Sequence, residues 1–163
     1  MVTLQDARRV IAAAEAKASE IGQPMNIAVV DGGGNLISHV RMDGAWIGSI
    51  DISINKAFTS RAFDITTKDL ADNSQSGDQF FGIHVSNRGR IMIFAGGIPL
   101  KRDGTVQILG VGEAPSHGVP LVLYSRSRAA RAYVNLTTEL LRRTARRRGR
   151  RQRVSLARAA SLL

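Results

Sequence analysis

Histidine is the residue type in this sequence best suited to metal or cofactor chemistry, because the chain has three histidines and no cysteine. His84 follows the aromatic pair Phe80-Phe81 within a Ser-, Gly- and Asn-rich segment that we predict to be an ordered loop. The imidazole of His84 on such a loop is a candidate metal ligand. The rings of Phe80 and Phe81 are candidates to stack on a flat ligand. The alternative is that Phe80 and Phe81 fill the core while His84 hydrogen-bonds the backbone.

Cationic side chains provide a second group of candidates, suited to binding a carboxylate. His39 and Arg41 share one face of a predicted strand, and Lys56 lies on a predicted helix that is otherwise rich in apolar residues. Arginine can pair with a carboxylate through two hydrogen bonds, so Arg41, Lys56 and Arg61 are candidate partners for an acidic group. The alternatives are solvated charges or pairing with nearby aspartates, and a surface position for His39.

Several common catalytic patterns are missing from the sequence. The absence of cysteine excludes a disulfide scaffold, a thiolate zinc site and a cysteine nucleophile. No Ser-His-Asp spacing, paired-carboxylate motif or HExxH pattern is present, which disfavours a metal hydrolase. The glycines between Asp31 and Asn35 do not open a helix after a strand, so they indicate a hairpin turn and not a dinucleotide site.

The elements that must position these residues follow from periodicity and turn signals. Apolar residues recur at spacings of three and four in two segments, and short β-rich runs are separated by Gly- and Asp-containing turns. Periodicity assigns Ile11, Ile54 and Phe94 to the core, and the stripe of the second segment consists of Ile50, Ile54, Ala57, Phe58 and Ala62. We expect helices over 4–21 and 47–63, a short helix opening at 66, a strand over 90–95, and hairpins over 26–42 and 100–111. Because hairpins dominate, the predicted fold class is α+β, a two-layer sandwich with an antiparallel sheet of about five strands and helices packed on it.

Charge divides the 163-residue chain into two parts. Residues 1–125 hold 11 basic and 12 acidic residues, whereas residues 126–163 hold 12 arginines and one acidic residue. We therefore expect a near-neutral domain over 1–112 and a divergent basic tail over 113–163. The arginine-rich run covers 142–153, and its residues 144–153 contain no large apolar residue, so we expect 144–153 to be disordered or a solvated helix. Such a run would bind nucleic-acid phosphates without sequence specificity.

The N-terminal residues and the hydropathy predict a cytoplasmic protein. No run of 18 apolar residues occurs, and the first residues enter a helical pattern without the basic and apolar regions of a signal peptide.

A series of motifs over about residues 3–106 resembles the GlcG/HbpS family, which includes the C-terminal domain of PduO-type proteins. The motifs occur in the family's order, and those that carry the likeness are Val29-Val-Asp31-x-x-Gly34-x-Leu36, Arg41-Met-Asp-Gly44-Ala, Lys56-Ala-Phe-Thr59, Gly82-Ile-His-x-Ser-Asn87, Gly89-Arg-Ile-Met-Ile-Phe94 and Gly96-Gly-Ile-Pro-Leu-Lys-Arg-Asp-Gly104. After the last motif the sequence departs from the family pattern, and either a shifted reading frame or a genuine fused tail explains the change.

The resemblance implies a small oligomeric α+β domain that binds haem, with cobalamin or iron as further cofactors linked to family members. On this basis we place the cofactor site at His84, Phe80, Phe81, His39, Arg41 and Lys56, with His84 as the ligand of the iron. Our leading hypothesis is a homo-oligomeric tetrapyrrole-binding protein and not an enzyme. The alternatives are a catabolic enzyme or accessory protein acting on a hydroxy or aromatic acid, and a nucleic-acid interaction module based on the tail.

Overall fold

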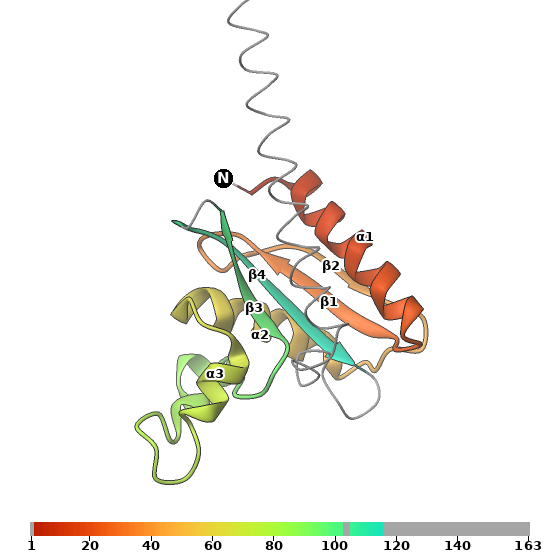
Figure 1. Cartoon of the computed structure of the whole chain (residues 1–163). Helices are drawn as coiled ribbons and strands as arrows, with labels where there is room; N and C mark the ends of the chain where they lie inside the picture. Colours follow the sequence, from red (N-terminus) through yellow and green to blue (C-terminus); the bar gives the residue numbers. More distant parts are fainter. Residues whose placement is uncertain (1, 103–104, 116–163) are drawn as a thin grey trace, which may run out of the picture.

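The computed structural model describes residues 2–102 and 105–115 (Figure 1). Four strands form an antiparallel sheet in the order β2-β1-β4-β3. Together with the helices, the elements in chain order are α1 (Leu4–Glu20), β1 (Met25–Val30), β2 (Leu36–Arg41), α2 (Ser49–Phe63), α3 (Thr67–Asp72), the 3-10 turns η1 (Ile83–Val85) and η2 (Asn87–Gly89), β3 (Gly97–Arg102) and β4 (Thr105–Pro115).

Helix α1 confirms the first predicted helix. A capping box starts it: the Thr3 side chain accepts a hydrogen bond from the Asp6 N–H at 3.2 Å, and the Asp6 carboxylate accepts one from the Thr3 N–H at 3.1 Å. The buried face of α1 is apolar and includes Val10, Ile11 and Ala14. It packs on one face of the sheet, where Ile27 and the strand β3 complete the main hydrophobic core.

Strand β1 lies in the interior of the sheet and is buried on both faces. All six of its residues are buried, and its apolar residues alternate between two clusters. Ile27 and Val29 face α1, whereas Ala28 and Val30 pack with Ala57 of α2. Helices therefore cover both faces of the sheet, as Figure 1 shows with α1 and α2 on opposite sides. The antiparallel α+β class is confirmed, but the described residues form three layers and four strands, where two layers and about five strands were predicted.

The predicted turn between the first two strands is present. The Asp31 carboxylate accepts hydrogen bonds from the Gly33 N–H at 2.8 Å and the Asn35 N–H at 2.9 Å. Gly34 has φ +78°, a conformation that favours glycine. The glycines thus close a hairpin between β1 and β2, as their sequence context predicted.

Helix α2 buries a polar face, which the sequence analysis did not predict. The apolar stripe expected on this helix included Ile54 and Phe58, but both are only partly buried. The buried positions instead include Ser53, Lys56 and Thr59, each 0–1% exposed. Of the predicted apolar stripe, Ala57 is fully buried and Ile54 packs against the same cluster, whereas most of the buried positions of α2 are polar, so the predicted buried face is confirmed only in part.

The segment before β3 explains this polar face. The Thr59 hydroxyl accepts a hydrogen bond from the Met92 N–H at 3.0 Å and lies 3.2 Å from the Arg90 carbonyl oxygen. The Thr67 hydroxyl accepts one from the Gly97 N–H at 2.8 Å. Buried backbone groups need partners, and side chains of α2 and α3 supply them here in place of a neighbouring strand. The predicted strand over 90–95 is therefore wrong, and β3 begins only at Gly97.

Three further sequence predictions can be compared with the structure. Ile11 is buried at 6% exposure, but Phe94, which periodicity assigned to the core, is 43% exposed. The β3–β4 hairpin is confirmed, and β4 continues to Pro115, beyond the boundary predicted at residue 112.

The predictions for the basic tail lie outside the described residues, apart from its first three positions in β4. Within the part that is described, no helix is long and apolar enough to cross a membrane.

Candidate functional site

The predicted ligand His84 lies on an exposed segment over residues 73–90, which we call the loop segment. This segment follows α3 and extends away from the sheet (Figure 1). His84 is exposed on η1, and Phe80, Phe81 and Val85 are 36%, 65% and 72% exposed. Backbone hydrogen bonds from Ile83 to Phe80 and from Val85 to Gly82, 2.9 and 3.1 Å long, fold the segment into short turns. The alternative that the two phenylalanines fill the core is therefore wrong.

His39 and Arg41 are both on strand β2. His39 is paired in register with Ala28 on the edge strand β2 and is half-buried, between the ligand-facing position and the surface position that the sequence left open. Its Nε2 is buried and has no hydrogen-bond partner among the described residues, and burial lowers the pKa of its imidazole. Arg41 is exposed, and its Nη1 donates a hydrogen bond to the Ala45 carbonyl oxygen at 2.9 Å. Arg41 thereby bridges the end of β2 to the following turn.

Lys56 is fully buried in α2 at 0% exposure. Its Nζ lies 4.1 Å from the centroid of the Phe94 ring, a cation–π geometry that accompanies the burial of the ammonium group. The six predicted site residues therefore lie on three different elements: the loop segment, strand β2 and the interior face of α2. The contact of Phe94 with Lys56 could not be predicted from the sequence, because periodicity places this ring on a strand and in the core.

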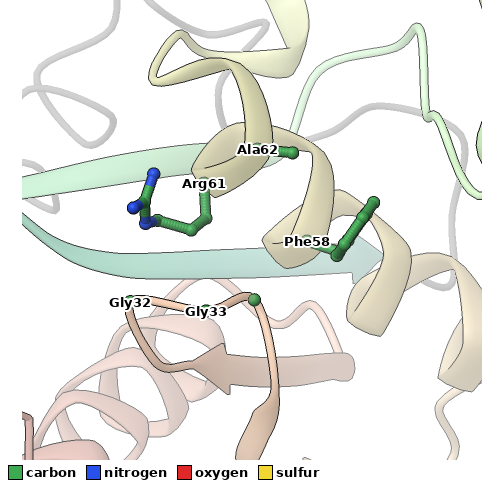
Figure 2. A pocket seen from close by; sticks show the side chains of 6 residues that line it. Gly32, Gly33, Phe58, Arg61 and Ala62 are labelled. Atoms are coloured by element: carbon green, nitrogen blue, oxygen red, sulfur yellow. The ribbon is translucent and has the colours of Figure 1, made fainter.

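A small hollow of about 190 Å³ lies between the β1–β2 turn and the C-terminal half of α2. The residues that line it are Gly32, Gly33, Gly34, Phe58, Arg61 and Ala62. Figure 2 shows Phe58 and Arg61 leaving the same helix in different directions, with the glycine turn on the opposite side of the hollow. We call this the glycine-turn hollow.

Arg61 is the charged group of the glycine-turn hollow. Its Nη1 pairs with the Asp64 carboxylate at 2.8 Å, and its side chain is 21% exposed. Its Nε is buried without a hydrogen-bond partner in the part of the chain that the structure describes. Because Nε is buried, a ligand in the hollow would contact the terminal N–H groups of this guanidinium.

Phe58 forms the apolar wall of the glycine-turn hollow. The guanidinium of Arg90 lies over its ring, with the Cζ 3.7 Å from the centroid. A Cβ on Gly34 would lie 2.9 Å from the Phe58 ring, so glycine is needed there for contact as well as for its positive φ. The sequence contained Arg61 and the glycine run as separate signals, but nothing in it indicated that they meet.

Metal ligands do not cluster in the described structure. Across residues 2–102 and 105–115, no group of three or more histidine, cysteine or acidic side chains is placed to hold a metal ion. Haem binding needs only a single protein ligand to the iron, so this finding does not bear on the haem expectation. The expectations of cobalamin and iron stay predictions.

The fold and the exposed side chains of the loop segment define a class of protein. It is an α+β domain with an antiparallel sheet and an exposed loop that carries aromatic and histidine side chains. Residues 2–115 match the family model HbpS-like, described as "Haem degrading protein HbpS-like". The chain belongs to this family, which confirms the resemblance inferred from the motifs.

Two relatives of known sequence are similar to this chain over about two thirds of its length. The chain is 42% identical over 105 residues to an uncharacterised 15.0 kDa protein from the dhaT-dhaS intergenic region of Citrobacter freundii, covering 64% of this chain and 74% of the relative. It is 30% identical over 111 residues to the corrinoid adenosyltransferase PduO of Salmonella typhimurium. That match covers 68% of this chain but only 33% of PduO, so the chain corresponds to about a third of that enzyme.

Solved structures with the same fold include several family members. The ORFY protein of Klebsiella pneumoniae has a TM-score of 0.73 and 31% identity, and the match covers 86% of this chain and 90% of ORFY. A double mutant of HbpS from Streptomyces reticuli has a TM-score of 0.66 and 27% identity, covering 83% and 86% of the two chains. A PduOC–haem complex has a TM-score of 0.71 at 24% identity, covering 85% and 94%, which shows a shared fold.

Proposed function

We propose that this protein binds haem at the exposed face of the loop segment, with His84 as the axial ligand of the iron. Membership of the HbpS-like family supports a haem-related function. The observation that carries the assignment of the site is the joint exposure of Phe81, His84 and Val85 on consecutive short turns. An imidazole flanked by exposed apolar side chains has the two properties that a haem face needs.

The physical argument concerns apolar surface in water. Phe81 and Val85 are 65% and 72% exposed, and burying apolar surface contributes about 25 cal/mol per Å². A porphyrin laid against the loop segment would cover these side chains while His84 reaches the iron. Arg88 is exposed four residues further on and can pair with a propionate. When bound, haem would supply a redox-active iron, and the residues of this chain would position and partly desolvate it.

The glycine-turn hollow is a poor alternative for the porphyrin. Its volume of about 190 Å³ is below the range of about 300–1,000 Å³ typical of sites for drug-sized ligands. None of the six residues that line it is a histidine. We therefore place the tetrapyrrole on the loop segment and treat the hollow separately.

Hemin titration followed by absorbance tests this proposal. We expect the wild type to bind with micromolar or tighter affinity and to shift the Soret band. His84→Ala should change the Soret position or weaken binding about tenfold or more, and added imidazole should restore the spectrum. His117→Ala is the control, because it removes a histidine to which we assign no role. Unchanged spectra for His84→Ala would contradict His84 as the ligand, and an absent Soret shift in the wild type would contradict haem binding.

We further propose that the protein is a homo-oligomer. Large apolar side chains are exposed in the described structure, including Trp46 and Ile47 at 56% and 76%, and subunit contact would cover such groups. Light scattering coupled to size-exclusion chromatography measures the mass directly. A mass equal to 17.6 kDa at micromolar concentration would contradict this proposal.

A further inference from the structure

The geometry of the glycine-turn hollow points to a second binding site, for a small aryl carboxylic acid, separate from the proposed haem face. We propose that the carboxylate pairs with Arg61 and that the ring lies against Phe58. This proposal stands on the geometry of the hollow and does not depend on haem binding.

Arg61 provides the charge recognition. Its side chain lines the hollow and is 21% exposed, and its Nη1 donates to Asp64 at 2.8 Å. Because Nε is buried, a ligand in the hollow would contact the terminal N–H groups, which hold more donors than one pair with Asp64 uses. A carboxylate suits the group, because its two oxygens can accept hydrogen bonds from N–H groups of one guanidinium.

The glycine turn argues for a carboxylate and against a phosphate. Glycine-rich phosphate sites offer several backbone N–H groups to the ligand. Here the Gly33 N–H donates to the Asp31 carboxylate and the Gly34 N–H to the Asp31 carbonyl oxygen, at 2.8 and 3.0 Å. These donors are used within the turn, so the turn contributes shape, and the charge recognition comes from Arg61.

Phe58 argues for an aromatic ligand of limited size. Its ring is fixed between the Arg90 guanidinium, 3.7 Å from its centroid, and Gly34. A fixed ring at the wall of a hollow favours offset or edge-to-face contact with a second ring. The volume of about 190 Å³ admits a single-ring acid such as benzoate.

Titration calorimetry with benzoate is the test, with benzamide as the neutral ligand of the same shape. We expect saturable benzoate binding and benzamide binding weaker by about tenfold or more, because the amide loses the charge-assisted pair. In ¹H–¹⁵N spectra, benzoate should shift the amides of the glycine turn. Equal binding of the two ligands, or no saturation with benzoate, would overturn the proposal.

Variants with opposite expected signs sharpen the test. Arg61→Gln should weaken benzoate binding about tenfold or more, whereas Lys68→Gln removes a positive charge on α3 outside the hollow and should leave it unchanged. Asp64→Asn should tighten binding by releasing the guanidinium from its ion pair. Asn tolerates the left-handed backbone at position 64, where φ is +54°, so this variant should fold even if Arg61→Gln does not.

A haem propionate is the other source of a carboxylate, and competition distinguishes it from a free acid. A steric variant, Ala62→Leu, extends a side chain from an exposed position at the rim of the hollow and should abolish benzoate binding while leaving the Soret shift with hemin intact. Hemin should not displace benzoate from the wild type. Displacement of benzoate by hemin, or loss of the Soret shift in Ala62→Leu, would show that the hollow receives a propionate and would overturn the free-acid proposal.

Discussion

At the scale of single residues, two cationic side chains owe their properties to burial. Lys56 is 0% exposed with its ammonium group over the Phe94 ring, although a lysine on a helix normally extends its charged end to solvent. His39 is half-buried on β2 with an Nε2 that has no partner among the described residues. Both residues were predicted to contact a ligand. In the structure each packs inside the protein, and a contact with a ligand would be a second role.

The burial of His39 predicts a pH dependence of stability. Because burial lowers its pKa below the usual 6.5, the unfolded chain takes up a proton at a higher pH than the folded chain does. Stability should therefore fall as the pH drops from about 6.5 towards the folded pKa and should level off below it. Urea denaturation at pH values across this window measures the slope.

A variant of His39 isolates its contribution from that of the other titrating groups. His39→Gln should flatten the pH dependence of the unfolding free energy between about pH 7 and 5. An equal slope in His39→Gln and the wild type would contradict the assignment.

At the scale of elements, helix α2 is unusual because its buried face carries hydroxyl groups and a lysine. The face serves the backbone of residues 90–97, most of which is not paired with any strand among the described residues. Thr59 is the central contact, with its hydroxyl 2.7 Å from the Asn55 carbonyl oxygen, 3.2 Å from that of Arg90 and 3.0 Å from the Met92 nitrogen.

Removing the Thr59 hydroxyl should therefore destabilise the protein. Thr59→Val preserves the shape of the side chain but leaves the Met92 N–H without its acceptor, which we expect to cost about 1–3 kcal/mol of unfolding free energy. Thr59→Ser keeps the hydroxyl and should lose much less of this contribution. Urea denaturation of the three proteins provides the comparison, and equal stability of the valine and serine variants would contradict the role given to this hydroxyl.

At the scale of the whole molecule, the charge is divided between two parts of the chain. Residues 1–125 are close to neutral, whereas residues 126–163 hold 12 arginines and one acidic residue. The described sheet and its helices lie entirely within the first part. Any attraction to nucleic acid should therefore arise from the C-terminal arginines and should weaken steeply with salt.

A truncation tests this division of charge. The chain ending at Ser125 should elute from a heparin column at much lower salt than the full chain, because it lacks 12 arginines. Its hemin titration should match that of the full chain if the loop segment carries the site. Equal retention of the two proteins on heparin would show that the near-neutral part binds polyanions by itself.

Sequence by itself determined the features that depend on local chemistry. The capping box at Thr3 and Asp6, the apolar stripe of α1 and the glycine turn after Val30 each act within a few residues of chain, so their patterns predicted the helix and the hairpin correctly. The family motifs gave the α+β class for a similar reason, since they record the same local elements in the same order.

Tertiary structure decided the features that depend on which segments meet. The run 90–95 has strand-forming residues, but its backbone is hydrogen-bonded by an α2 side chain and not by a strand. The same contact buries the polar face of α2 and leaves Phe94 exposed. Helices pack on both faces of the sheet, and this packing buries β1 completely. The glycine-turn hollow joins residues 32–34 to Arg61, a contact that no local pattern encodes because it exists only once α2 packs against the sheet.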